Sequence, residues 1–249
     1  MRKIFLLSLL VIFCFPVVSY AQGCMEASSE EGVNVVGYLQ SQYEYKFHDG
    51  DDENYFTFNR ARMGLIGNIP YDFSYYVMYE FSPFKGGAPY LLDGFITYSR
   101  LAPYVNISLG QFKSPFSLEV NTPCQGLHTI NRSNVVGALA IPFRDIGVLI
   151  SGNHNKKIKY AFAITNGTGK GEEENNQSKD FAGRVVIDAI KFVSFGGSFS
   201  MKTLPPASEG ATEDDKLNKF AGELQIEYNN LLFQGEYIMA NYESSGGVI

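Results

Sequence analysis

The alternation of apolar and polar residues is the feature that most constrains what this chain can fold into. It is clearest in three stretches, residues 72–81, 158–165 and 193–202. In 158–165 the even-numbered positions are Ile, Tyr, Phe and Ile, and the positions between them are Lys, Ala, Ala and Thr. A repeat of two residues places neighbouring side chains on opposite faces, so these stretches are predicted to be β-strands with one apolar and one polar face.

The connections between such stretches alternate between short and long. Eleven strands are predicted, at roughly 33–47, 54–69, 72–82, 90–100, 104–113, 144–152, 156–166, 180–190, 192–202, 219–229 and 231–241. The long connections are 48–53, 83–89, 114–143, 167–179 and 203–218. A soluble β-sandwich has no reason to sort its connections by length, whereas an outer-membrane barrel has short periplasmic turns and long outer loops. The predicted fold class is therefore all-β, an antiparallel transmembrane β-barrel in the outer membrane of a Gram-negative bacterium.

The number of strands and the last residues of the sequence suggest that more strands follow. Bacterial outer-membrane barrels normally close with an even number of strands, and eleven is odd. Residues 244–249 are rich in Ser and Gly, like the start of a loop. We therefore expect the sequence to be the N-terminal part of a longer barrel.

The first residues are typical of a secretory signal peptide. Arg2 and Lys3 precede an apolar run at 4–18, and Ser19-Tyr20-Ala21 is a small-x-small cleavage site. The predicted organisation is a signal peptide at 1–21, an N-terminal lead at 22–32 and a barrel domain at 33–249. Lipidation of Cys24 stays open, because the residues around it resemble a lipoprotein acceptor only weakly.

Composition excludes several other classes. The mature chain would keep two cysteines, Cys24 and Cys124, a hundred residues apart, which do not make a disulfide framework. The three histidines are scattered and no metal-site spacing occurs, so neither a metal nor a cofactor is predicted. No nucleic-acid partner is predicted. Ser, His and acidic residues are present without a spacing that would bring them together, so the chain is not expected to be an enzyme.

The acidic net charge of −6 conceals an uneven distribution. Fourteen of the 26 acidic residues lie in three loop clusters and in the N-terminal lead, which leaves 12 acidic residues against the 18 basic residues of the mature chain. The predicted wall is therefore mildly basic. The acidic loops are consistent with simple solvation of the outer surface, or with an adhesin or surface-binding protein.

Arg60 and Arg62 form the sharpest candidate pair. They share one face of a predicted strand, and Ala61, Met63 and Leu65 form the other, apolar face. An arginine that faced lipid would cost about 2–4 kcal/mol at the bilayer midplane, so both guanidinium groups are predicted to face the lumen. There they would attract anions, or they would pair with carboxylates such as Glu44, Glu80 or Asp93.

The connection 114–143 is too apolar for a solvated loop. Nine apolar residues lie along it: Phe116, Leu118, Val120, Leu127, Ile130, Val135, Val136, Leu139 and Ile141. We expect it to fold into the barrel and to present Arg132, His128 or Glu119 to the pore. The alternative is a lid or a contact loop between subunits. Lys113 and Arg144 flank it and would line the pore or its rim.

Five motifs, taken in order, resemble the phosphate-selective porin O/P family. They are Phe58-Asn59-Arg60-Ala61-Arg62, Gly110-Gln111-Phe112-Lys113-Ser114-Pro115-Phe116-Ser117-Leu118-Glu119, Asn131-Arg132-Ser133, Pro142-Phe143-Arg144-Asp145-Ile146-Gly147 and Lys179-Asp180-Phe181-Ala182-Gly183-Arg184. The resemblance implies a sixteen-stranded barrel, usually a homotrimer, in which an arginine ladder leads to an eyelet formed by the third outer loop. Asn131 departs from the family pattern, which has an acidic residue there.

The resemblance also assigns roles to individual residues. Arg60 and Arg62 match the family's paired arginines, Lys113 its strand lysine and Arg132 its loop arginine. The residues predicted to line an anion pathway are Arg60, Arg62, Lys113, Arg132, Arg144 and Arg184. The predicted function is passive diffusion of small, phosphate-like anions through a porin embedded in outer-membrane lipid, with no catalytic step.

Overall fold

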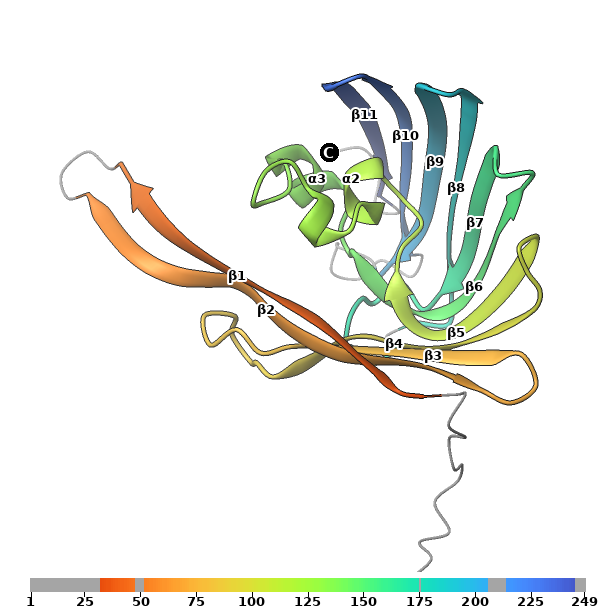
Figure 1. The fold of residues 1–249 in the computed structure, drawn as a ribbon, viewed down its shortest axis with the longest axis horizontal. Coiled ribbons are helices and arrows are strands. Elements are labelled where there is room, and N and C mark those ends of the chain that lie inside the picture. Colours follow the sequence, from red (N-terminus) through yellow and green to blue (C-terminus); the bar gives the residue numbers. More distant parts are fainter. Residues whose placement is uncertain (1–31, 48–51, 175, 206–213, 245–249) are drawn as a thin grey trace, which may run out of the picture.

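The computed structural model describes residues 32–47, 52–174, 176–205 and 214–244, and within them the chain forms one antiparallel sheet of eleven strands (Figure 1). The strands are β1 (Asn34–Lys46), β2 (Glu53–Ile69), β3 (Phe73–Glu80), β4 (Tyr90–Leu101), β5 (Val105–Lys113), β6 (Arg144–His154), β7 (Ile158–Thr165), β8 (Asp180–Ile190), β9 (Val193–Leu204), β10 (Asp215–Tyr228) and β11 (Leu231–Glu243). Each strand pairs with its neighbours in the sequence, so the order is a simple meander. The predicted all-β, antiparallel fold is confirmed.

The largest difference from the predicted strand boundaries is at β10. β10 begins at Asp215, four residues before the predicted start at 219. The acidic residues here are typical of a loop, but Asp215 is buried and its carboxylate accepts a hydrogen bond from the Tyr242 hydroxyl of β11. A partner on a neighbouring strand therefore allows a charged residue to lie within the sheet.

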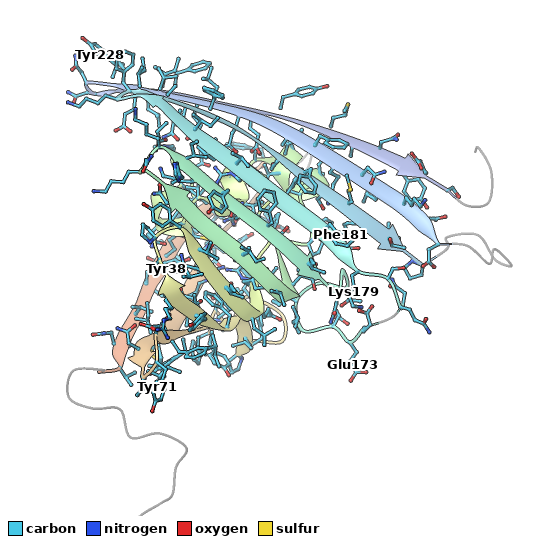
Figure 2. All side chains as sticks on the ribbon, turned by 90° about the vertical axis from the view of Figure 1, so that its right-hand side faces the viewer. Tyr38, Tyr71, Glu173, Lys179, Phe181 and Tyr228 are labelled. Atoms are coloured by element: carbon cyan, nitrogen blue, oxygen red, sulfur yellow. The ribbon has the colours of Figure 1, made fainter. Side chains whose placement is uncertain are left out.

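The connections are sorted by length, as predicted. Those after β1, β3, β5, β7 and β9 contain 6, 9, 30, 14 and 10 residues, whereas those after the even-numbered strands up to β10 contain two or three. In an antiparallel meander the two sets lie at opposite edges of the sheet. Figure 2 shows Tyr71 and Tyr228 at the edge with the short turns, and Glu173 and Lys179 at the edge with the long connections.

The outer face of the sheet carries large exposed apolar side chains. Phe162, Phe181, Phe195 and Phe220 lie on four successive strands, and each is between 43% and 48% exposed. Between them on the same strands lie residues with small or polar side chains, including Ala163, Ala182, Ser198 and Lys219, which are buried on the concave face. An apolar face of this extent is typical of contact with lipid.

The connection after β5 lies on the concave side of the curled sheet (Figure 1). It contains α2 (Leu118–Asn121), a 3-10 turn η1 (Cys124–Gly126) and α3 (Asn134–Leu139). Its buried cluster consists of Phe116, Val120, Val136 and Ala140, which pack with Ala221 of β10 and Ile238 of β11. Three of its apolar residues, Ile130, Val135 and Ile141, are not buried and are 49%, 55% and 53% exposed.

No helix among the described residues is long and apolar enough to cross a membrane. The predicted signal peptide, Cys24 and nearly all of the predicted lead at 22–32 lie outside the described residues, as do 48–51 and 206–213 within two of the long connections.

Candidate functional site

A β-bulge on β2 turns two neighbouring polar side chains toward the connection 114–143. The pairing of β1 with β2 steps from Gln40–Arg60 to Ser41–Phe58, so Asn59 has no opposite residue. Arg60 donates from Nη1 to the carbonyl oxygen of Ile130 at 2.6 Å and to Oε1 of Gln40 at 2.5 Å. Asn59 donates to Oδ1 of Asn131 at 2.9 Å. Strict alternation could not predict that Asn59 joins Arg60 at this contact.

Arg62 faces the same side but has a carboxylate partner. Its Nε lies 2.9 Å from Oε2 of Glu80, which is fully buried. Oε1 of Glu80 also accepts hydrogen bonds from the backbone amides of Ala61 and Ser82, at 2.8 and 3.1 Å. Of the three carboxylates considered as partners from the sequence, Glu80 is therefore the one that pairs with Arg62.

Two further predicted arginines are also paired. Arg144 of β6 forms a two-pronged ion pair with Asp93 of β4, with both N–O distances 2.9 Å. Arg184 of β8 forms a similar pair with Glu223 of β10, at 2.9 and 2.6 Å. The rigid fork of a guanidinium suits this geometry, and each pair ties together two strands of the wall.

The other three predicted residues, Arg60, Lys113 and Arg132, form no ion pair with a carboxylate among the described residues. They bind oxygens of the loop instead. Lys113 Nζ and Arg132 Nη2 each lie 3.5 Å from the same carbonyl oxygen, that of Thr122. Arg132 also donates from Nε to the carbonyl of Glu119 at 3.0 Å. None of these three positive charges is therefore neutralised by a carboxylate within the described residues.

Gly110 makes the local geometry before Lys113 possible. Its φ of +135° is a conformation that favours glycine, and a Cβ there would lie 2.2 Å from the carbonyl oxygen of Gly94. The following Gln111 donates to the carbonyls of Leu91 and Leu92, and Phe112 is buried. The end of β5, which carries Lys113, is thereby fixed against β4.

Cys124 was not predicted to belong to the site, although the structure places it among these cations. Its Sγ lies 3.2 Å from Arg62 Nη1 and 3.5 Å from Arg132 Nη2. Burial alone would raise the pKa of this thiol, but the nearby cations Arg62, Arg132 and Lys113, together with a hydrogen bond from Tyr38, lower the pKa to about 6. The sequence did contain a signal, since Cys124 lies in the middle of a loop expected to fold inward.

Two cavities border the loop. Arg62, Lys113, Cys124, Arg144 and Tyr38 line part of one, with a volume of about 630 Å³. Arg60 and Arg132 line the other, with a volume of about 470 Å³, and the Arg132 guanidinium reaches Cys124 of the first. Arg184 lines neither, so the structure brings together five of the six predicted residues. No group of three or more potential metal ligands occurs within the described ranges.

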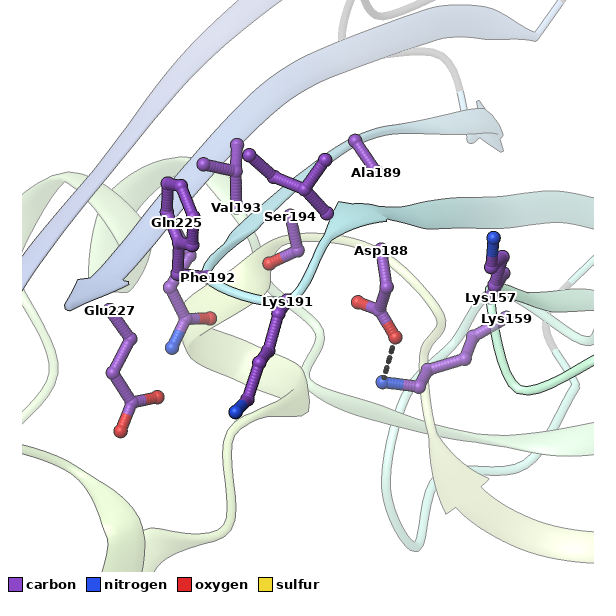
Figure 3. Close-up of a pocket in the computed structure, with 11 residues that line it drawn as sticks. Lys157, Lys159, Asp188, Ala189, Lys191, Phe192, Val193, Ser194, Gln225 and Glu227 are labelled. Atoms are coloured by element: carbon purple, nitrogen blue, oxygen red, sulfur yellow. Dashed lines mark ion pairs between the residues drawn. The ribbon is translucent and has the colours of Figure 1, made fainter. Parts of the chain in front are cut away.

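A third cavity of about 690 Å³ lies at the short turns, where Lys157, Lys159 and Lys191 gather (Figure 3). Lys159 forms an ion pair with Asp188 at 3.0 Å, and Glu227 lies on the same rim. The side chains of this pair are 56% and 31% exposed, so water screens their charges. This cavity contains none of the predicted pathway residues.

A match to a protein-family model shows the family to which this chain belongs. The family model named phosphate-selective porin O and P matches residues 33–247. The chain belongs to this porin family. A comparison with curated proteins gave no match. Among solved structures, the anion-selective porin from Comamonas acidovorans is similar, with a TM-score of 0.64 and 12% identity over 85% of this chain and 68% of that chain.

The suspected family resemblance is thereby confirmed, and the similarity to the Comamonas structure supports the fold. As a member of a porin family, the protein is a bacterial outer-membrane protein that forms a channel rather than an enzyme. The family match also covers the whole connection 114–143 and all six predicted pathway residues, although it assigns no role to any of them.

Proposed function

We propose that this porin lets small anions diffuse across the outer membrane, and that the loop 114–143 narrows the passage and carries its selectivity. The observation that carries the proposal is the meeting of Arg60, Lys113 and Arg132 around the loop without a carboxylate partner in the described parts of the chain. Fixed positive charges at a narrow point raise the local concentration of anions and exclude cations.

The paired arginines contribute differently. A guanidinium that already binds a carboxylate adds little net charge to the passage, so Arg144 and Arg184 serve mainly to hold the wall together. Arg62 is intermediate, because Glu80 balances its charge while its Nη1 still reaches Cys124 in the cavity. The proposed selectivity group is therefore smaller than the six residues predicted from the sequence.

The names of similar proteins are consistent with this proposal. The matched family is described as phosphate-selective, and the similar solved porin as anion-selective. Lysine and arginine donors bind phosphate oxygens well, and a chain of such donors suits a small oxyanion. We accordingly propose small inorganic oxyanions such as phosphate as the solute class.

We further propose the orientation and assembly. The signal peptide at 1–21 would be removed on export, and the long connections would face the outside of the cell, with the short turns in the periplasm. Assembly into a homotrimer is proposed from the family resemblance.

The test is reconstitution of the natural full-length protein in a planar lipid bilayer. In a salt gradient, the reversal potential is expected to have the sign that marks a preference for anions, and added phosphate should reduce chloride current by competition. Deleting residues 120–138 should raise conductance, because the narrowing segment is removed. Cation preference would contradict the anion proposal, and a closed lumen without conductance would favour a surface-binding role.

A further inference from the structure

The connection 114–143 is attached to two distant parts of the sheet. At one end, Arg60 of β2 binds the carbonyl of Ile130 at 2.6 Å. On the far side, the segment around α2 contacts β9 and β11 through Ser198 and Glu236, and Ile141 at the C-terminal end of the connection contacts Lys219 of the strand between them, β10. In Figure 1 this connection lies between these two parts of the sheet, so it crosses the concave side as a strap.

Glu236 makes the most extensive of these contacts. Its Oε1 accepts a hydrogen bond from the backbone amide of Leu118 at 2.7 Å, and its Oε2 accepts from the Ser117 hydroxyl at 3.0 Å. The backbone amide of Glu119 lies 3.5 Å from Oε2. Within the described residues Glu236 forms no ion pair with a lysine or arginine. Its charge is therefore directed to the loop and to no neighbouring cation.

The backbone at the contact is held in an unfavourable conformation. Ser117 has a φ of +71° although it is not glycine, and such residues persist only where their surroundings hold them. Its amide donates to Ser198 Oγ at 3.1 Å, and its own hydroxyl accepts from Val120. Nearby, Lys219 donates to the carbonyl of Ile141 at 2.7 Å.

The contact is connected to the cation cluster through the loop itself. Glu119, beside the Glu236 contact, accepts hydrogen bonds from the amide and hydroxyl of Ser133 through Oε2, both at 2.9 Å. The Glu119 carbonyl accepts from Arg132 at 3.0 Å. A shift of the segment at Ser117–Glu119 would therefore move the partner atoms that hold Arg132.

We infer that Glu236 is a positioning residue that fixes the strap against the far wall and thereby sets the place of Arg132 and the width of the passage. This inference rests on the proposed anion passage. Under this inference the negatively charged Glu236 maintains anion selectivity. Its charge alone would repel anions and lower that selectivity.

A charge effect and a positioning effect of Glu236 predict opposite changes in anion preference, so two substitutions of this residue can distinguish them. Glu236→Ala and Glu236→Gln both remove the charge, but the glutamine amide oxygen can still accept from Leu118 and its nitrogen can donate to the Ser117 hydroxyl. If Glu236 acted only through charge, both variants would raise anion preference equally. If it positions the strap, Glu236→Ala should raise conductance roughly twofold and lower anion preference, and Glu236→Gln should keep the parent conductance.

Glu227→Ala is the matched control. Glu227 is a glutamate on the neighbouring strand β10 and lines the cavity at the short turns (Figure 3). Its removal takes one negative charge from the wall away from the strap, so it should leave conductance unchanged and raise anion preference slightly. Behaviour of Glu236→Ala like that of Glu227→Ala would overturn the inference while leaving the anion proposal intact. Loss of anion preference in the parent protein would instead contradict the anion proposal itself.

Thiol chemistry provides a second measurement. Cys124 is buried within the strap, so release of the strap should expose it. In a Cys24→Ser background, Glu236→Ala should increase the rate of Cys124 modification by a water-soluble methanethiosulfonate about tenfold over Glu236→Gln. Should Glu236→Ala fail to fold, Ser117→Ala removes one donor to the same carboxylate and should give a smaller increase. Equal rates of Cys124 modification in the folded alanine and glutamine variants would contradict the positioning role of Glu236.

Discussion

Two groups of cations on the concave face differ in their partners rather than in their residue type. In the wall, Arg144, Arg184 and Lys202 each have a carboxylate partner on another strand, Asp93, Glu223 and Asp180 respectively. Around the strap, Arg60, Lys113 and Arg132 bind backbone or neutral oxygens. The comparison shows that a carboxylate on another strand neutralises one group of cations and leaves the other group without such a partner, and on the proposed function only the second group attracts anions.

The largest expected effect breaks a wall pair. Asp93→Ala would leave Arg144 buried without its partner, since both side chains are less than 10% exposed, and should lower the free energy of unfolding by about 3 kcal/mol. Urea unfolding in detergent, followed by circular dichroism, measures it. The control is Asp188→Ala, whose exposed pair with Lys159 should contribute less than about 1 kcal/mol. Equal losses in the two variants would mean that burial of the pair does not matter.

The next effect concerns the strap cations. Arg132→Glu reverses a charge beside the passage, where partial desolvation strengthens its field, and should reduce the anion-to-cation permeability ratio roughly tenfold. Reversal potentials in a salt gradient give this ratio. Lys170→Glu, the same reversal in the connection after β7, should change the ratio much less. A larger effect at Lys170 would move the selectivity site to the outer mouth.

A smaller change in selectivity is expected to distinguish cations that are paired with a carboxylate from cations that are not. Removing Arg184 and Glu223 together leaves the net charge unchanged and should preserve the permeability ratio. Arg60→Gln removes one unpaired charge and should lower the ratio about two- to threefold. Both are measured by reversal potential, with circular dichroism to verify folding. Selectivity that survives Arg60→Gln but not the double variant would reverse the assignment of the two groups.

The smallest effect is on pH dependence. The pKa of the Cys124 thiol is about 6, so the thiol is neutral below that pH and carries a negative charge above it. That charge offsets Arg62 and Arg132, and anion preference should therefore fall modestly as the pH rises from about 5 to about 7, about one pH unit on either side of this pKa. Cys124→Ser cannot ionise in this range and should remove the change. A pH dependence that persists in Cys124→Ser would contradict the assignment to this thiol.

The strands that form the wall of this porin could be predicted from the sequence because the constraint on their side chains acts between neighbouring residues. Each strand places one side chain in two against an apolar surrounding, so Phe162 and Ile164 had to alternate with Ala163 and Thr165. Turn length is also local, and the predicted alternation of short and long connections agrees with the structure. The same periodicity puts Arg60 and Arg62 on one face of β2, and in the structure both side chains lie on the side that the connection 114–143 contacts.

The candidate site was only partly readable, because pairing is decided by residues far apart in the chain. Glu80, Asp93 and Glu44 were equally plausible partners for Arg62 from the sequence, and only the register of β2 with β3 brings Arg62 opposite Glu80. The bulge at Asn59 breaks the period-two rule that the prediction used. The position of Cys124 between Arg62 and Arg132 depends on the path of the connection 114–143, whose sequence has no periodic pattern from which that path could be predicted.

The sequence by itself thus determined the strands, their faces, the sorting of the connections and the presence of inward cations. These follow from the period of a strand and from the high cost of placing charge against lipid. The tertiary structure alone decided which cations are neutralised, and it alone attached the loop to Glu236, 118 residues from Leu118. A hydrogen bond across that separation depends on the curvature and register of the whole sheet, and no local pattern of residues encodes either.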